Sequence, residues 1–234
     1  GSHFGATTSF QVGANVLQTI EMSLGAFSTA TLGRTTQYGS HLSTAPTSAQ
    51  VSQPTSKYVT TNNTTGTWTQ RGSDIDGEAA GDYSGYSVSL SSDGSTVAIG
   101  APYNDGNGAG GLQGDVGHVR VYKNISGTWT QVGSDIDGET LRDKSGISVS
   151  LSSDGSTVAI GAAGNDGNGS SAGQVRIYKD SSGTWTQEGL DIDGEAAGDR
   201  SGISVSLSSD GRTVAIGAWG NDGNGSFAGH VRAY

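Results

Sequence analysis

The sequence of 234 residues contains no cysteine, three prolines, one methionine and four phenylalanines. Without cysteine the chain has no disulfide framework, no thiolate nucleophile and no thiolate ligand for a metal. No apolar run reaches the roughly 18 residues of a membrane-spanning helix, and no signal peptide is visible. Packing, metal binding or assembly must therefore hold the protein together, and no membrane partner is predicted.

Basic residues are also scarce, since 12 Lys and Arg stand against 22 Asp and Glu, for a net charge of −10. All acidic residues except Glu21 lie after residue 65. A nucleic-acid backbone needs a stripe of Lys and Arg, so nucleic-acid binding is excluded. Such an acidic surface suits solvent exposure or the collection of cations.

Glycine is abundant, with 40 residues beside many stretches in which valine alternates with other residues. Helical proteins do not combine so much glycine with alternating β-branched residues, whereas short strands joined by tight turns do. The composition therefore predicts an all-β fold.

Internal repetition is the strongest signal, because a fixed period specifies architecture more firmly than local propensity. Trp68, Trp129 and Trp185 each stand in a copy of Gly-Thr-Trp-Thr-Gln. The predicted repeats span residues 66–126, 127–182 and 183–234. Residues 109–117 stand opposite the shorter stretch 170–173, so the added residues are predicted to lie in a loop.

Each copy is predicted to form four strands. In the second copy, residues 127–133 give one strand, residues 146–162 give two strands joined by a Ser-Asp-Gly turn, and residues 173–179 give the fourth. Apolar residues alternate with serines before this turn, as in a half-buried strand. A repeated four-stranded unit of roughly 55–60 residues is typical of a β-propeller blade.

The stretch Ser84–Tyr122 resembles the FG-GAP repeat of integrin-α-type propellers, in which Phe-Gly opens a blade and Gly-Ala-Pro follows its second strand. Ser-Gly replaces the first pair in every copy, and Gly-Ala-Pro occurs only at residues 100–102. The resemblance covers residues 66–234. Propellers typically have four to eight blades, whereas this chain has three repeats. Three arrangements are possible: the linker supplies a fourth blade, two chains join as three plus three blades, or the repeats stack as an open array.

Residues 7–33 resemble bacterial flagellin, through Gln-Val-Gly-Ala-Asn at 11–15, Gln-Thr-Ile at 18–20 and a closing Thr-Leu-Gly. In that family a β-hairpin with these motifs precedes the variable outer domain. The helices that flank it in flagellins are absent, and residues 1–3 resemble a tag scar. The chain is therefore expected to be a fragment without the polymerising ends.

The expected organisation is a tag scar and β-hairpin segment at 1–33, a Ser/Thr-rich linker at 34–65 and three repeats at 66–234. The resemblances imply a structural outer domain of a flagellin-like subunit, on the extracellular surface of the bacterial flagellar filament. In the full-length protein it would self-assemble with other flagellin subunits. The alternative is an extracellular β-propeller adhesin for a glycan or protein ligand, with calcium as a candidate cofactor.

An acidic stretch, Asp-Ile-Asp-Gly-Glu, follows the tryptophan strand in each copy. Alternate carboxylates around a glycine turn can converge on calcium, which takes six to eight oxygen ligands. The candidate metal ligands are Asp74, Asp76, Glu78, Asp82, Asp135, Asp137, Glu139, Asp143, Asp191, Asp193, Glu195 and Asp199. The alternative is a turn in which Asp side chains accept backbone N–H bonds, and the EF-hand spacing is not met.

The integrin-type calcium loop belongs elsewhere, at the Ser-Ser-Asp-Gly turns, where this chain has only Asp93, Asp154 and Asp210. Scattered histidines, triplicated carboxylates and the lack of a nucleophile or metalloprotease motif predict that the chain is not an enzyme. The three repeat tryptophans are predicted to pack between blades. Trp219 has no aromatic equivalent in the other copies and is the candidate for ligand binding.

Calcium titration followed by thermal melting tests the metal interpretation. An ion that binds only the folded chain raises the melting midpoint. We expect millimolar calcium to raise it if the acidic stretches hold the ion, whereas an unchanged midpoint would reduce these stretches to turns.

Overall fold

The computed structural model describes residues 7–11, 19–23, 68–106 and 114–234. The chain divides into two units, Gly1–Thr55 and Ser56–Tyr234. In the first unit, β1 (Thr7–Gln11) and β2 (Thr19–Ser23) pair antiparallel. The predicted turn between them and the predicted linker at 34–65 lie outside the described residues.

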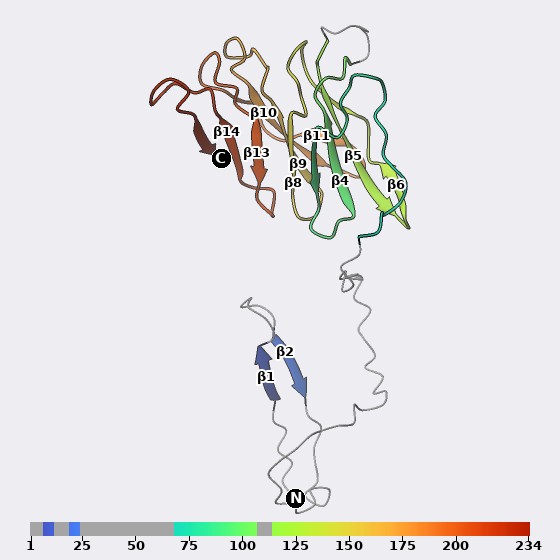
Figure 1. Ribbon diagram of the computed structural model, residues 1–234. Coiled ribbons are helices and arrows are strands. Elements are labelled where there is room, and N and C mark those ends of the chain that lie inside the picture. Colours follow the sequence, from blue (N-terminus) through green and yellow to red (C-terminus); the bar gives the residue numbers. More distant parts are fainter. Residues whose placement is uncertain (1–6, 12–18, 24–67, 107–113) are drawn as a thin grey trace, which may run out of the picture. The chain divides into compact units, whose positions relative to one another are not determined.

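The second unit contains three antiparallel sheets (Figure 1). Sheet 1 has the order β3 (Ser87–Leu90), β4 (Thr96–Ala101), β5 (His118–Ile125) and β6 (Thr128–Gln131), and the short β7 (Ile136–Asp137) also pairs with β5. Sheet 2 has the order β8 (Ser148–Leu151), β9 (Thr157–Ala162), β10 (Gln174–Asp180) and β11 (Trp185–Gln187), and β12 (Ile192–Asp193) pairs with β10. Sheet 3 has β13 (Ser204–Leu207), β14 (Val214–Ala218) and β15 (His230–Ala233).

These sheets confirm the all-β prediction, and they do not close into a barrel. The Ser-Ser-Asp-Gly stretches form the first turn of each sheet, as predicted. The longer loop predicted at residues 109–117 lies between β4 and β5 in the sequence, but residues 107–113 are outside the described ranges. Within the described ranges, no helix has the length and apolar character that crossing a bilayer requires.

The sheets are offset from the sequence repeats by one strand. The tryptophan strand of the second copy, β6, pairs with β5 of the first copy, with Tyr122 opposite Gln131. The tryptophan strand of the third copy, β11, pairs in the same way with β10. The prediction that each copy forms its own four-stranded blade was therefore wrong, because antiparallel pairing joins the end of one copy to the start of the next.

The three sheets lie in a row, and in the described residues the sheet pairing is incomplete at both ends of it. The described part of sheet 3 has three strands and contains no tryptophan strand. The first tryptophan segment, from Trp68 to Gln70, forms no strand, and the Trp68 side chain is 92% exposed. Figure 1 shows the C-terminal strand and the segment that follows residue 67 at opposite ends of this row.

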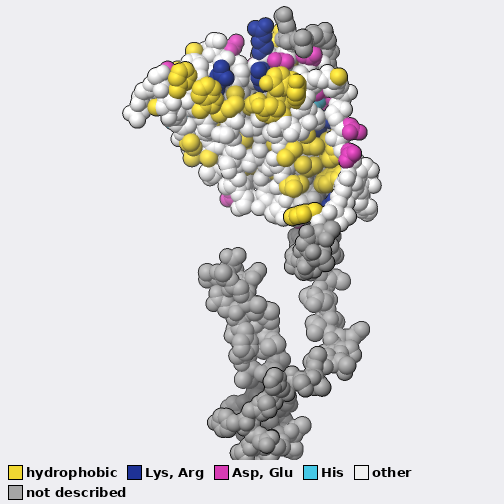
Figure 2. Space-filling view, viewed as in Figure 1, with side chains coloured by type: hydrophobic (Ala, Val, Ile, Leu, Met, Phe, Trp, Pro, Cys, Tyr) yellow, Lys and Arg dark blue, Asp and Glu magenta, His cyan; other side chains and the backbone are white. Residues whose placement is uncertain are grey.

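Two apolar clusters hold the sheets together. The cluster between sheets 1 and 2 contains Ala98, Val119, Val121, Ile136, Val149, Leu151, Val158 and Ile160, with Tyr178 and Trp185 packed against it. The cluster between sheets 2 and 3 contains Ala159, Val175, Val214 and Ile216, with Ile177, Ile192, Val205 and Leu207 against it. Other hydrophobic side chains gather on the outer face of the unit (Figure 2).

The two glycine motifs of the repeat meet within each sheet. In sheet 2 the N–H of Gly146 donates to the carbonyl of Gly161 at 3.0 Å, and Gly161 also packs against the Gly202 carbonyl of the next copy. A Cβ at Gly161 would collide with that carbonyl. Glycine is therefore required here so that neighbouring sheets approach closely.

Serines of the first strands link neighbouring sheets. Ser89 Oγ accepts the N–H of Leu151 at 2.9 Å, and Ser150 Oγ accepts the N–H of Leu207 at 2.9 Å. Ser148 Oγ donates to the Gly202 carbonyl at 2.7 Å. The alternation of serine with apolar residues thus places bonding groups on one face of the strand and packing groups on the other.

Substitution of Trp185 tests the contact between sheets 1 and 2. Its Nε1 donates to the Val132 carbonyl at 2.9 Å, and its ring packs on the apolar cluster between these sheets. We expect Trp185→Phe to lower the free energy of unfolding by about 1 kcal/mol and Trp185→Ala by about 3 kcal/mol. Trp68→Ala is the control and should have no effect on the monomer. Denaturant unfolding measures all three, and an equal loss in Trp68→Ala would contradict this account.

Candidate functional site

The four predicted metal ligands of each copy go to four different places. In the first copy, Asp82 is 5% exposed and its Oδ2 accepts the N–H of Ala79 at 3.1 Å and the Asn104 side chain at 3.0 Å. The equivalent Asp143 and Asp199 make the same two kinds of bond. The fourth carboxylate of each stretch therefore closes a turn.

The first carboxylate of each stretch accepts a glutamine side chain of the preceding tryptophan strand. The pairs are Gln70 with Asp74, Gln131 with Asp135 and Gln187 with Asp191, at 2.7–2.8 Å. The second residue contributes its backbone, because the carbonyls of Asp76, Asp137 and Asp193 each accept an arginine Nη2. Neither group points to one shared centre within a copy.

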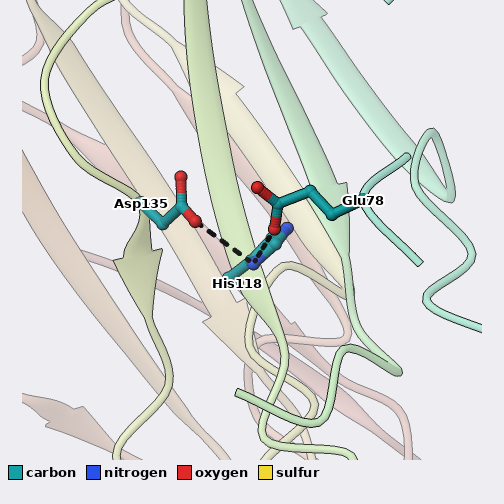
Figure 3. A group of neighbouring side chains, drawn as sticks. All are labelled: Glu78, His118 and Asp135. Atoms are coloured by element: carbon teal, nitrogen blue, oxygen red, sulfur yellow. Dashed lines mark ion pairs between the residues drawn. The ribbon is translucent and has the colours of Figure 1, made fainter. Parts of the chain in front are cut away.

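Carboxylates from consecutive copies meet instead at His118. His118 Nδ1 lies 3.8 Å from Glu78 Oε2 of the first copy and 3.9 Å from Asp135 Oδ2 of the second (Figure 3). The His118 side chain is 2% exposed, and its Nε2 has no hydrogen-bond partner among the described residues. This is the one group of three metal-capable side chains found among the described residues.

The same position changes from copy to copy. In the second copy Gln174 replaces the histidine, and its Nε2 donates to Glu139 Oε2 at 2.9 Å. In the third copy His230 Nδ1 lies 3.5 Å from Glu195 Oε2. The first cluster includes Asp135 from the following copy, whereas no such aspartate contact is found for His230 and Glu195 in the described residues.

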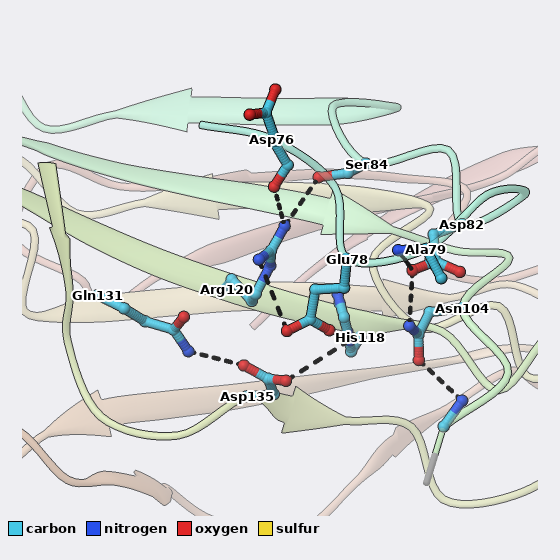
Figure 4. Close-up of polar contacts among 11 residues, drawn as sticks. Asp76, Glu78, Ala79, Asp82, Ser84, Asn104, His118, Arg120, Gln131 and Asp135 are labelled. Atoms are coloured by element: carbon cyan, nitrogen blue, oxygen red, sulfur yellow. Dashed lines mark hydrogen bonds and ion pairs between the residues drawn. The ribbon is translucent and has the colours of Figure 1, made fainter. Parts of the chain in front are cut away.

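An arginine beside this group holds the acidic stretch on the sheet. Arg120 Nη2 donates to the Asp76 carbonyl at 2.8 Å and to Ser84 Oγ at 3.3 Å, and Nη1 lies 3.7 Å from Glu78 Oε1 (Figure 4). Arg176 and Arg232 repeat this contact. These arginines were not among the predicted site residues. The signal that could have found them is the repeated motif Val-Arg-x-Tyr, in which x is Val, Ile or Ala.

The described geometry favours a structural role for the acidic stretches. Calcium prefers an all-oxygen shell of six to eight ligands, whereas the group at His118 offers two carboxylates and an imidazole. Glu78 is also paired with the Arg120 cation. Calcium binding by the twelve carboxylates stays a prediction.

The carboxylates of the Ser-Ser-Asp-Gly turns are bonded within the turn. Asp154 Oδ1 accepts the Ser152 hydroxyl at 2.7 Å and the Ser156 N–H at 3.0 Å. The Ser152 hydroxyl and then the Ser156 N–H hold the pKa of Asp154 below its ordinary value, because both stabilise the charged form. The Ser91 and Ser208 hydroxyls lower the pKa of Asp93 and Asp210 in the same way.

A second group of side chains lies at the opposite end of the strands from these turns. Trp219, predicted to make a ligand contact, is 47% exposed and stacks on Phe227 with ring centroids 5.8 Å apart. The Arg200 guanidinium lies 5.1 Å from the Trp219 ring centroid. We call this region the loop-end surface, formed by Tyr83, Tyr86, Tyr103, Arg142, Lys144, Arg200, Trp219 and Phe227.

Comparison with known proteins finds a family similarity for two stretches of the chain. Residues 74–114 and 185–234 match the model of the FG-GAP repeat family. These two stretches are therefore similar to FG-GAP repeats, which supports the predicted resemblance. The match does not reach residues 7–33, so the flagellin resemblance stays a prediction, and no curated protein matches the chain.

Two solved structures show a distant likeness. The hydrazine synthase of Kuenenia stuttgartiensis is 16% identical over 63% of this chain and 32% of its own, with a TM-score of 0.39. A periplasmic gluconolactonase of Pseudomonas aeruginosa is 19% identical over 58% of this chain and 37% of its own, with a TM-score of 0.37. The chain spans about a third of the length of either protein. At this level of similarity, the functions of these two proteins say nothing about the function of this chain.

Asp154→Asn tests the bonding of the turn. Because the folded pKa lies below the unfolded one, the carboxylate adds stability above the unfolded pKa and loses it as the pH falls through the folded pKa. We expect Asp154→Asn to lower the free energy of unfolding by about 1 kcal/mol at pH 7. The difference from the unmodified chain should shrink below about pH 4.

Denaturant unfolding at pH 7, 5 and 3 measures this difference. Glu188→Gln is the control, since Glu188 is exposed and no side-chain contact is found for it within the described residues. A difference for Asp154→Asn that stays constant over this pH range would argue against the bonded carboxylate.

Proposed function

We propose that the three repeats form an extracellular binding module that recognises glycans through the loop-end surface. The observation that carries this proposal is the distribution of differences among the copies. The copies share their strands and acidic stretches almost unchanged, whereas several of their largest side-chain differences gather at this one end. A scaffold held constant beneath varied side chains is the usual arrangement of a binding surface.

One variable position is held in an unusual backbone conformation. Tyr83, Lys144 and Arg200 occupy the same place in the three copies, with φ of 53°, 56° and 57°. A bulky side chain in the left-handed region costs roughly 1–2 kcal/mol, and such residues cluster at functional sites. Maintaining three different side chains there supports a role for them beyond packing.

The chemistry of the surface suits sugars. Tyr83, Tyr86, Trp219 and Phe227 are between 47% and 66% exposed, which leaves aromatic faces open for stacking on sugar rings. Lys144 lies 4.8 Å from the Tyr103 ring centroid, so cations stand beside the rings. Figure 2 shows Lys and Arg side chains beside hydrophobic ones at the upper edge of the repeats.

A cleft of about 580 Å³ opens in this surface between the loops of all three copies. Tyr86, Tyr103, Lys144, Asp166 and Arg200 are among its lining residues. It therefore combines aromatic faces with hydrogen-bonding groups of both charges, as a site for an acidic or neutral oligosaccharide would.

A second proposed role is the outer domain of a flagellin-like filament subunit, exposed on the bacterial surface. It rests on the motifs within residues 7–33, where β1 and β2 pair antiparallel. The two roles are compatible, since an outer domain can also adhere. Electron microscopy of the full-length protein together with a glycan array separates them, because filaments without ligands support only this second role.

Trp219 provides the sharpest test of binding. A glycan array with the full chain identifies the sugar, and calorimetry then measures its affinity. We expect Trp219→Ala to weaken binding about tenfold, the effect of losing a stacking contact of roughly 1.4 kcal/mol. Trp219→Phe should retain most of the affinity.

Ile125→Ala is the matched control, because Ile125 is exposed at the other end of the strands. It should bind as the unmodified chain does. Equal affinity in Trp219→Ala and the unmodified chain would rule out this surface, and binding of proteins without glycans would reassign its ligand class.

A further inference from the structure

We propose that Glu78, His118 and Asp135 form a binding site for one divalent cation of the zinc class, which accepts both nitrogen and oxygen ligands. The site joins two copies of the repeat, because Glu78 and His118 belong to the first copy and Asp135 belongs to the second. The inference is independent of the glycan proposal, since none of the three residues lines the cleft of the loop-end surface. It differs from the calcium prediction in the class of metal and in the imidazole ligand.

The His118 imidazole is the observation that points to a ligand. Its side chain is 2% exposed, and Nε2 makes no hydrogen bond within the part of the chain that the structure describes. Nδ1 faces Glu78 Oε2 and Asp135 Oδ2 across gaps of 3.8 and 3.9 Å, which are longer than a hydrogen bond (Figure 3). Buried polar groups usually have a bonded partner. A cation between these three atoms would supply one to Nδ1.

The spacing of the ligand atoms is close to that of a zinc-class site. Zinc lies about 2.0–2.2 Å from imidazole nitrogen and carboxylate oxygen in a tetrahedral shell, which separates neighbouring ligand atoms by about 3.3–3.6 Å. The Nδ1–oxygen distances are 3.8 and 3.9 Å, and the three ligand atoms lie within 4.8 Å of one another. The Glu78 and Asp135 side chains are 44% and 30% exposed, so they can close this difference by rotation. Their exposure also gives the cation a path from solvent.

Each carboxylate has one oxygen beside a protein donor and the other turned toward His118. Gln131 Nε2 donates to Asp135 Oδ1 at 2.7 Å, whereas Oδ2 faces the imidazole. Arg120 Nη1 lies 3.7 Å from Glu78 Oε1, whereas Oε2 faces the imidazole (Figure 4). Outer contacts of this kind orient the carboxylates of metal sites. The two oxygens are therefore presented to one point before a cation arrives.

Paired strands fix the position of the imidazole. His118 is the first residue of β5 and stands opposite Ala101 of β4 and Asp137 of β7. Asp135 directly precedes β7, so its backbone is held beside β5 as well. Sites built on strands keep their geometry better than sites built on loops. Only Glu78 must be positioned by a connection, and Arg120 holds the backbone of that connection at the Asp76 carbonyl.

The donor set selects the class of metal. Calcium and magnesium prefer shells of oxygen alone, whereas imidazole suits zinc, copper and nickel. The charges of two carboxylates balance a divalent cation, although the Arg120 cation beside Glu78 weakens the attraction. Ligation by Nδ1 also places the ring proton on Nε2, which has no acceptor among the described residues. Outer hydrogen bonds of this kind contribute about 10- to 100-fold in affinity, so we expect micromolar binding.

The second copy shows how the chain folds without this imidazole. Gln174 stands at the position of His118, and its Nε2 donates to Glu139 Oε2 at 2.9 Å. A direct hydrogen bond thus replaces the gap seen in the first copy, and the equivalent strands pair in the same way. We therefore expect His118→Gln to remove the nitrogen ligand and to keep the fold.

Calorimetric titration of the full chain with zinc chloride tests the site. We expect His118→Gln and Asp135→Asn each to weaken zinc binding by more than about tenfold, because each removes a ligand. Asp135→Asn keeps an oxygen acceptor for Gln131. Glu188→Gln is the matched control, since it removes a carboxylate outside the site, and it should bind zinc as the unmodified chain does.

Gln174→His provides the reverse test in the second copy. This substitution adds an imidazole between Glu139 and Asp191, which correspond to Glu78 and Asp135. Gln187 donates to Asp191 Oδ1 at 2.7 Å, as Gln131 does to Asp135. We expect the number of zinc ions bound with micromolar affinity to rise by one per chain.

Circular dichroism establishes whether each variant keeps the fold. Zinc should raise the melting midpoint of the unmodified chain, because the ion binds only the folded state, and should raise that of His118→Gln less. Absence of zinc binding, or binding undiminished in both His118→Gln and Asp135→Asn, would overturn the proposal. Unchanged stoichiometry in folded Gln174→His would do so independently. Displacement of zinc by equimolar calcium would also overturn it and return Glu78 and Asp135 to the calcium prediction.

Discussion

The fold depends on the pairing of the tryptophan strand of one copy with the last strand of the preceding copy, as β6 pairs with β5 and β11 with β10. This pairing makes the sheet and the sequence repeat different units, so no copy can complete its sheet alone. The indole N–H of this strand, from Trp129 or Trp185, donates a hydrogen bond to a backbone carbonyl of the preceding copy. Cohesion between copies therefore comes from backbone pairing as well as apolar packing.

The acidic stretches follow from the same arrangement. Each acidic stretch connects one sheet to the next. Arg120 and Arg176, in the third strands of sheets 1 and 2, donate hydrogen bonds to the backbone carbonyls of Asp76 and Asp137 in these connections. The buried fourth carboxylate closes the turn with backbone and asparagine donors, which avoids leaving a buried charge without partners. Triplicated carboxylates thus serve connections that occur three times.

Comparison of the copies distinguishes a constant scaffold of strands from the variable loop-end surface. Strands, glycine contacts and serine bonds recur with little change, because the same inter-sheet distance must be met at each junction. The loop ends carry Tyr, Lys or Arg at one backbone position. Four exposed aromatic rings, those of Tyr83, Tyr86, Trp219 and Phe227, gather where such variation is allowed.

The sequence by itself determined the all-β class, the internal repeats with their likeness to the FG-GAP family, the turns at Ser-Ser-Asp-Gly and the exposure of Trp219, because these depend on local alternation, glycine and repeat register. Tertiary structure alone decided which copy each tryptophan strand joins and that Glu78 meets Asp135 at His118. Both are pairings between residues distant in sequence. Strand periodicity specifies which face of a strand is buried but carries no information about its neighbour.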